Sequence, residues 1–230
     1  LDRPVSVWNN GEGTTTISYD VFGRQTEVQY PNYSESMSAN SAKVKYYDVF
    51  LEGSKKYSMI MSISPENKVS CEYYDEYGRV VKKAVVTNPS DLLRLSNLDN
   101  LVQMPSSIKL INTATYEYDD LDRVITEKDG ENRATTYTYN AAGKVLTVSV
   151  GNSSAGFAQI QYTYDKAGRV TKVTQGTHIT TYIYDLAGRV TKETDPMGYY
   201  TLTYYDNAGN VESSRDKNGD YTYYTYDSRN

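Results

Sequence analysis

Tyrosines alternate with polar or β-branched residues along much of the chain, and a turn signal follows each alternating stretch. In Tyr162-Thr163-Tyr164 both rings fall on one face of a strand, because successive side chains of a strand point to opposite faces. Asp165 and Gly168 then mark a tight turn, in which the carboxylate can accept a backbone N–H and the glycine can adopt positive φ. Val170 begins a second stretch rich in β-branched residues. The pattern predicts a β-hairpin.

The hairpin pattern repeats along the chain. The Asp or Asn that follows the second tyrosine lies at positions 119, 140, 165, 185, 206 and 227, at intervals of 21, 25, 20, 21 and 21. A single hairpin is only marginally stable in water, so we expect the units to stack edge to edge. The predicted fold class is therefore all-β, with repetitive antiparallel β-hairpins stacked into one twisted, curved sheet.

The two halves of the chain differ in regularity. Residues 113–230 carry the regular repeats, whereas residues 1–112 hold divergent copies with long insertions. Leucines recur at every third position from 92 to 101, which predicts a short helical or irregular insertion near residues 90–102, with Ser90 as the helix cap. Both ends of the chain fall inside repeat units, so we expect one continuous array that is a fragment of a longer protein.

Composition narrows the range of functions. The chain has 230 residues, 25 of them tyrosine, so tyrosine must supply much of the buried area. The net charge of −5 argues against nucleic-acid binding, and no apolar run is long enough for membrane insertion. His178 and Cys71 are the single histidine and the single cysteine, which leaves little material for a metal site, a disulfide framework or a catalytic triad. We expect no cofactor and no enzyme activity.

Two binding interpretations compete with purely structural ones. The carboxylates of Asp165, Asp185, Asp206 and Asp227 recur at repeat spacing and could share Ca²⁺, but the favoured interpretation is that each closes its own turn. Exposed tyrosines could stack on sugars, whereas packed tyrosines would form the thin core of the sheet. The candidate ligand face consists of Tyr199, Tyr200, Tyr221 and Tyr223.

The motif Tyr-Asp-x-x-Gly-Arg-Val, preceded by Tyr-x-Tyr, resembles the repeat of the YD-repeat (Rhs-repeat) family. This family includes bacterial Rhs and wall-associated proteins, toxin-complex shell subunits and animal teneurins. The resemblance covers essentially the whole chain. The resemblance implies that the positions matching the motif have an architectural role. These positions are Tyr74, Asp75, Gly78, Arg79, Tyr118, Asp119, Arg123, Tyr139, Gly143, Tyr164, Asp165, Gly168, Arg169, Tyr184, Asp185, Gly188, Arg189, Tyr205, Asp206 and Gly209.

The resemblance implies a function as well as a fold. Hairpins of the family join into a spiral shell, so this chain is expected to be a partial shell wall in a secreted or cell-surface protein of bacterial origin. Its expected partners are the remainder of the repeat array and an enclosed C-terminal, toxin-like polypeptide. The alternative is an adhesion module that binds carbohydrate or protein through exposed tyrosines and acidic residues. Lys144 and Asn210 replace the motif arginine and put the Asp–Arg pairing in doubt there.

Overall fold

A computed structural model describes residues 3, 5–9, 13–31, 41–152 and 156–227 of the chain. Within these residues the hydrogen-bonded strands form one sheet of eighteen strands, and the pairings between successive strands are antiparallel. The predicted all-β class, built from antiparallel hairpins in a single sheet, is confirmed. The chain divides into two compact units, Leu1–Asp122 with Glu127–Asn132, and Arg123–Thr126 with Arg133–Asn230.

The first unit is a run of hairpins in which each strand pairs with the next along the chain. Its strands are β1 (Ser6–Asn9), β2 (Gly13–Tyr19), β3 (Gln25–Gln29), β4 (Ser41–Glu52), β5 (Lys55–Ile63), β6 (Val69–Tyr74), β7 (Val80–Val86) and β8 (Leu110–Tyr118). The residues of β9 (Val124–Asp129) are divided between the two units.

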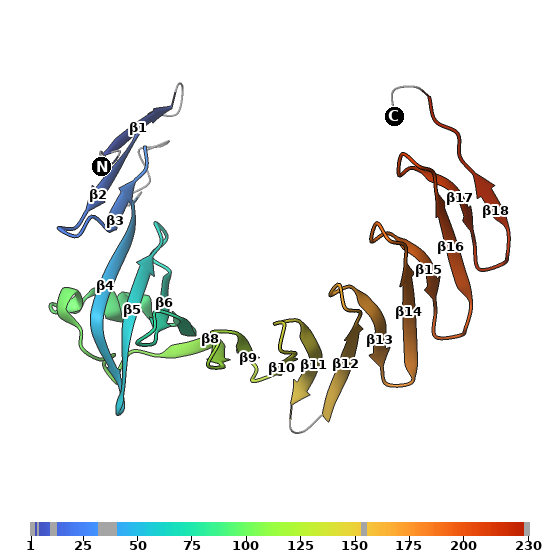
Figure 1. Cartoon of the computed structure of the whole chain (residues 1–230). Coiled ribbons are helices and arrows are strands. Elements are labelled where there is room, and N and C mark those ends of the chain that lie inside the picture. The colour runs from blue at the N-terminus through green and yellow to red at the C-terminus, as the bar shows by residue number, and fades with distance from the viewer. Residues whose placement is uncertain (1–2, 4, 10–12, 32–40, 153–155, 228–230) are drawn as a thin grey trace. The chain divides into compact units, whose positions relative to one another are not determined.

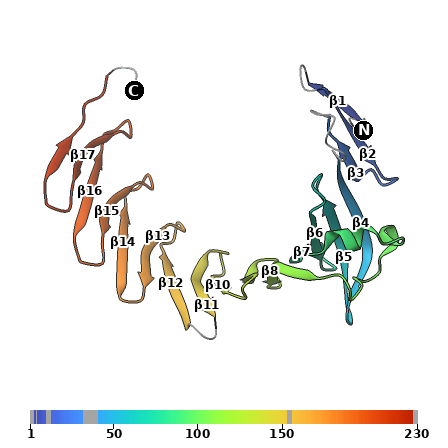
Figure 2. The same cartoon turned by 180° about the vertical axis from the view of Figure 1, so that it is seen from behind.

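A short helical insertion covers one face of the first unit. It contains α1 (Pro89–Leu93) and the 3₁₀-helix η1 (Leu98–Asn100), which lie against the hairpins of β4 to β7 in Figures 1 and 2. The predicted insertion near residues 90–102 is confirmed. The prediction that Ser90 caps the helix is wrong, because Asn88 precedes α1 and Pro89 takes the first helical position, where its missing N–H costs nothing.

The insertion and the sheet enclose a compact hydrophobic core. Side chains that alternate along β5 and β6 point to the same face and are almost fully buried, as the alternation of methionines in β5 indicates. The core includes Tyr47, Phe50, Met59, Met61, Cys71 and Tyr73 from the strands, Leu92 and Leu101 from the insertion, and Ile108 from the segment that leads into β8.

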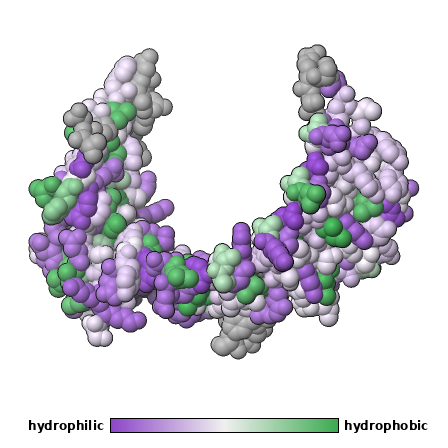
Figure 3. Space-filling view, in the orientation of Figure 1, coloured by the Kyte–Doolittle hydropathy of each residue, from purple (hydrophilic) through white to green (hydrophobic). Residues whose placement is uncertain are grey.

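The second unit continues the hairpins in regular succession, from yellow to red in Figure 1. Its strands are β10 (Ala134–Tyr139), β11 (Val145–Asn152), β12 (Gly156–Tyr164), β13 (Val170–Gln175), β14 (His178–Tyr184), β15 (Val190–Thr194), β16 (Tyr200–Tyr205), β17 (Val211–Arg215) and β18 (Tyr221–Tyr223). Most of its described side chains are half-buried or exposed. Figure 3 shows apolar and polar residues interspersed on the visible surface.

A β-bulge lies next to the turn in the hairpins β2–β3, β6–β7, β10–β11, β12–β13, β14–β15 and β16–β17. Ile183 pairs with Lys192, but the following Tyr184 pairs with Val190, so the return strand has one extra residue. That residue, Thr191, donates its hydroxyl hydrogen to the carbonyl oxygen of Ile183 at 3.2 Å. Because a bulge re-aims the adjacent side chains, it sets the direction of the second tyrosine of the motif.

Neither helix in the described part of the chain has the length and apolar character that a membrane-crossing helix requires.

Candidate functional site

The aspartate of each motif closes its own turn. The Oδ1 atom of Asp165 accepts the backbone N–H groups of Ala167 at 2.9 Å and Arg169 at 3.0 Å, and its Oδ2 atom accepts Nε–H of Arg169 at 2.7 Å. Gly168 has φ of +78°, a conformation that a residue with a Cβ adopts only at a cost. The turn is therefore specified by three side-chain bonds and one glycine. The same aspartate-to-arginine pairing is found in Asp20–Arg24, Asp75–Arg79 and Asp185–Arg189.

These bonds also fix the charge of the turn. The backbone N–H of Arg169, together with its guanidinium group, holds the pKa of the Asp165 carboxyl below its usual value. For Asp185 the backbone N–H of Arg189 lowers the pKa most strongly. Hydrogen bonds to the ionised form stabilise that form, so both carboxylates are charged at neutral pH.

The arginine of one hairpin contacts the tyrosine of the next. The guanidinium carbon of Arg169 lies 4.7 Å from the ring centroid of Tyr184, within the range of a cation–π interaction. Nη1 of Arg169 also donates to the carbonyl oxygen of Asp185 at 3.1 Å. The arginine thus joins two consecutive turns. Equivalent contacts are Arg24–Tyr46, Arg79–Tyr118, Arg123–Tyr139 and Arg189–Tyr205, at 4.3, 4.8, 4.5 and 4.2 Å.

The hydroxyl of the same tyrosine completes the link. Tyr184 donates to the carbonyl oxygen of Val170, the residue that follows Arg169, at 2.7 Å. We call this bond, with the ring–guanidinium contact where an arginine is present, the tyrosine link. The hydroxyl bond recurs as Tyr46–Gln25, Tyr118–Val80, Tyr139–Val124, Tyr164–Val145, Tyr205–Val190 and Tyr226–Val211, between 2.6 and 3.1 Å.

Departures from the motif keep parts of this geometry. Before Lys144 the turn is held by Asn140, whose side-chain oxygen accepts the backbone N–H groups of residues 142 and 144. Asn210 donates its side-chain N–H to Oδ2 of Asp206 at 3.2 Å, in place of the guanidinium. The hydroxyl bonds to Val145 and Val211 persist in both repeats, so the tyrosine link does not depend on arginine.

Tyr74 and the turn of Asp119 differ from the regular repeats. The hydroxyl of Tyr74 donates to Glu72 at 2.8 Å, and burial together with this carboxylate raises the pKa of Tyr74 to about 12. Asp119 accepts the backbone N–H of Leu121 at 2.9 Å. In that turn Asp122 occupies the glycine position with φ of +60°, and it forms an ion pair with Arg79 at 2.6 Å.

The structure brings together three of the four tyrosines of the candidate ligand face. The rings of Tyr221 and Tyr223 stack with centroids 6.2 Å apart, and Arg215, paired with Tyr221 across the sheet, lies 4.6 Å from the ring of Tyr200. Tyr199 lies outside β16, at the end of the Asp195 turn, and is exposed. These residues form an aromatic and cationic surface.

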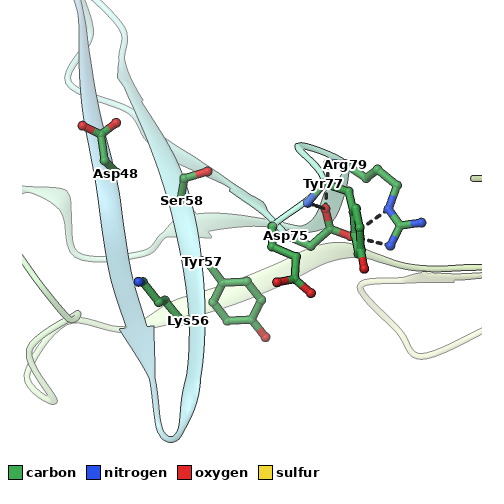
Figure 4. Close-up of a pocket in the computed structure, with 8 residues that line it drawn as sticks. Asp48, Lys56, Tyr57, Ser58, Asp75, Tyr77 and Arg79 are labelled. Carbon is green, nitrogen blue, oxygen red and sulfur yellow. Dashed lines mark hydrogen bonds and ion pairs between the residues drawn. The ribbon is translucent and has the colours of Figure 1, made fainter.

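A polar hollow of about 660 Å³ in the first unit is a second candidate site (Figure 4). Asp48 from β4, Ser58 from β5 and Tyr77 from the turn are among the side chains that line it. Three of its charged groups form ion pairs, because Arg79 pairs with Asp75 and Asp48 pairs with Arg24 at 3.1 Å, whereas Lys56 and Glu76 also line it.

Metal binding finds no support in the described residues, which contain no group of three or more metal-binding side chains placed to hold an ion. Asp165, Asp185 and Asp206 are each occupied in their own turns. Cys71 is fully buried, and burial raises the pKa of its thiol to about 12. His178 is exposed at the start of β14.

Sequence reasoning missed the tyrosine link and the depth of the first core. The recurrence of a motif tyrosine 14 or 15 residues after a motif valine was the available signal for the link. Burial of Tyr73 and Lys82 had a weaker signal, because Tyr204 and Lys192, which carry the same residue types at the equivalent positions of other hairpins, are not buried.

The bulged hairpins and their tyrosine links define a β-hairpin repeat protein. A family model described as teneurin YD-shell matches residues 79–228, and the chain belongs to this family. A structure of the Photorhabdus luminescens Tc holotoxin pore is similar to this chain, with a TM-score of 0.51 and 10% sequence identity. The aligned region covers 93% of this chain and 15% of the holotoxin chain. A crystal structure of TcdB2-TccC3 without its hypervariable C-terminal region has a TM-score of 0.48 and 15% sequence identity. The aligned region covers 93% of this chain and 12% of the TcdB2-TccC3 chain.

The similarity to the holotoxin structure shows the fold, and the chain spans about 15% of the length of that relative. No curated protein matches the chain.

Proposed function

We propose that this chain is a non-catalytic structural segment of a large secreted or cell-surface YD-repeat protein, in which it forms part of a β-shell. The tyrosine link is the observation that carries the proposal. In seven of the described hairpins it connects the hairpin to its neighbour through a side chain that the motif itself supplies. A site built for catalysis would hold free polar groups, whereas here the motif carboxylates close turns.

The proposal extends to the parent protein. Residues 1–112 would form divergent hairpins and residues 113–230 regular repeats of one continuous array within a longer chain. The shell would enclose a C-terminal, toxin-like polypeptide, and the source would be bacterial. The fold shared with a Tc holotoxin component supports this setting. Its partners would be the rest of the array and the enclosed polypeptide.

Limited proteolysis of the parent protein, followed by mass spectrometry, tests the shell function. A C-terminal polypeptide should resist digestion while the array is folded and should be degraded after mild unfolding. The same polypeptide expressed alone is the control and should be digested at once. If no segment is protected by the folded array, or if the isolated polypeptide is equally resistant, the enclosing function is refuted.

A second function, adhesion to carbohydrate or protein, is favoured by the surface around Tyr200, Tyr221 and Tyr223. Aromatic rings beside an arginine suit both sugars and peptides. Binding to immobilised glycans or partner proteins, compared between the natural chain and the Tyr221→Ala variant, tests it. Saturable binding that the substitution abolishes supports adhesion, and binding that the variant retains contradicts it.

A further inference from the structure

The same face of the repeat hairpin can be compared between the two units. Tyr73 pairs with Lys82 immediately before the bulge of its hairpin. Ile183 pairs with Lys192, and Tyr204 with Ser213, at the same place in theirs. These pairs are structurally equivalent, and cross-strand partners lie on one face of a sheet. The positions of Tyr73, Ile183 and Tyr204 therefore belong to the same face of the repeat.

In the first unit this face is covered. Tyr73 is only 1% exposed, and the side chains of Leu92 and Leu101 belong to the same core. The cover also makes polar contacts. Asp99 forms an ion pair with Lys45, and the carbonyl oxygen of Leu98 accepts the hydroxyl hydrogen of Tyr47 at 2.6 Å. Leucine side chains, a carboxylate and a backbone carbonyl are thus what this face binds within the chain itself.

In the second unit the equivalent positions are open. Ile183 is 56% exposed and Tyr204 is 44% exposed, although both occupy the position of the buried Tyr73. Nearby, Tyr223 pairs with Ser213 across the sheet and is 75% exposed. Exposed apolar side chains that adjoin one another mark interaction surfaces more often than scattered ones do.

Apolar and cationic residues alternate across this face. Strand pairing places Ile183 beside Lys192, then Leu202, Arg215 and Tyr221 in one row from β14 to β18. We call this row, together with Tyr204 and Tyr223, the β14–β18 face. The alternation matches a partner in which apolar side chains alternate with carboxylates.

The two cations of the row are available to such a partner. Lys192 and Arg215 lie over the ring of Tyr200, at 4.1 and 4.6 Å, and among the described residues neither forms an ion pair. Desolvation and the adjacent Tyr221, whose hydroxyl is hydrogen-bonded to that of Tyr204, raise the pKa of the Tyr204 hydroxyl. The opposite face is different, because Thr203, Ser214 and Thr222 form a small polar row there.

We propose that the β14–β18 face is a docking surface for a polypeptide segment that carries leucine or isoleucine side chains together with carboxylates. The segment would cover this face as residues 88–110 cover the equivalent face of the first unit. The inference rests on the second proposed function, adhesion, and assigns it a partner class; it does not depend on the shell function.

A synthetic peptide provides the test. Its sequence is that of residues 88–110 with the changes Arg94→Glu and Lys109→Glu, which add carboxylates, and it carries a fluorescent label. Titration of the full chain should raise the fluorescence anisotropy of the peptide to saturation. The double variant Ile183→Thr with Tyr204→Thr should weaken binding by about tenfold or more, since a few anchors dominate such interfaces. Threonine is the natural residue at this position in two sister repeats, as Thr138 and Thr163.

Two further variants test whether peptide binding depends on the β14–β18 face and on its positive charge. Tyr182→Thr is the matched control on the opposite face, where the equivalent residue is Thr203, and it should leave affinity within about twofold of the natural chain. Lys192→Thr should weaken binding and reduce its salt dependence, because the lost contact is electrostatic. Threonine or serine is also the natural residue at that position, in Thr147 and Ser213.

Hydroxyl-radical footprinting of the natural chain gives a readout that needs no variant. Tyr204 and Tyr223 should become protected when the peptide is present, while Tyr182 should not change. The absence of saturable binding up to about 1 mM peptide, or equal binding by the double variant, overturns the proposal. If a glycan rather than the peptide binds and the Tyr221→Ala variant loses it, the polypeptide inference fails while adhesion stands.

Discussion

The guanidinium group of Arg169 lies over the ring of Tyr184, and the two residues belong to consecutive hairpins. The position of the guanidinium is fixed from the other side by Asp165, which accepts its Nε–H. Closing one turn therefore prepares the surface on which the next hairpin packs. This coupling explains how a chain with little aliphatic core in its second unit builds a regular sheet: each hairpin supplies the contact that orients the next.

The first prediction concerns the hydroxyl of Tyr184. Tyr184→Phe removes the bond to the Val170 carbonyl and keeps the ring over Arg169. We expect the free energy of unfolding to fall by about 1 kcal/mol, the usual net value of one such bond. Tyr184→Leu should cost more, since it also removes the cation–π contact, worth about 0.5–1 kcal/mol at exposed sites. Urea unfolding monitored by circular dichroism measures both.

A matched control for this series is Tyr223→Phe, at an exposed tyrosine of β18. It should change stability by less than about 0.5 kcal/mol. Equal losses in Tyr184→Phe and Tyr223→Phe would show that the hydroxyl bond of the tyrosine link contributes nothing beyond the general effect of removing a tyrosine hydroxyl.

Local features of the repeat could be predicted from sequence because their causes are local. The turn of Asp165 and Gly168 depends on a carboxylate two residues from the N–H that it binds and on a glycine with positive φ. Strand alternation follows from the period of two, which places Met59 and Met61 on one face. The insertion near residues 90–102 was marked by the break in that period.

Features that depend on the register between hairpins could not be predicted. The bond from Tyr184 to Val170 requires the pairing of two strands and a bulge that re-aims the tyrosine. Likewise, Tyr73 and Tyr204 occupy the same motif position, yet one is buried and the other exposed. The difference arises from the insertion that covers only the first, and no signal within the motif encodes it.

The second prediction is a loss of stability in acid. Folding lowers the pKa values of Asp165, Asp185 and Asp206 below the unperturbed value of 3.8, chiefly through backbone N–H groups. The stability that these groups contribute is therefore present above the unfolded pKa and is lost as the pH falls through the lower folded values. The Tm should be nearly constant from pH 7 to about 5 and should fall below about pH 4.

Substitution of one turn aspartate checks the cause of this acid loss. Asp185→Asn should keep the backbone bonds of the turn, as Asn140 does in its own turn, and should make the decline of Tm with pH shallower. Asp185→Ala should lower the Tm at neutral pH as well, because those bonds are lost. A decline in Asp185→Asn as steep as in the natural chain would assign the acid sensitivity to other groups.

The third prediction concerns backbone strain at Gly143. This residue has φ of +77°, and an added Cβ would meet no atom within 4 Å, so any cost of substitution comes from the backbone conformation alone. Gly143→Ala should lower the free energy of unfolding by about 1–2 kcal/mol. Gly143→Asn should cost less, since asparagine tolerates this region better. A neutral alanine variant, measured by urea unfolding, would contradict the assigned role of the glycine.

The fourth prediction tests the cover of the first unit. Leu92 is fully buried between the insertion and the strand face, so Leu92→Ala should destabilise this unit by about 2–5 kcal/mol. Because the chain contains two compact units, a single unfolding transition is not guaranteed, and hydrogen exchange resolved by peptide is the better measurement. Exchange should accelerate in β5 and β6, while β14 and β15 should be unaffected.

Met197→Ala, at a residue exposed in the Asp195 turn, is the control and should alter neither region. Faster exchange in both units would mean that the cover stabilises the whole array, whereas no change in β5 and β6 would mean that the sheet face is stable without its cover.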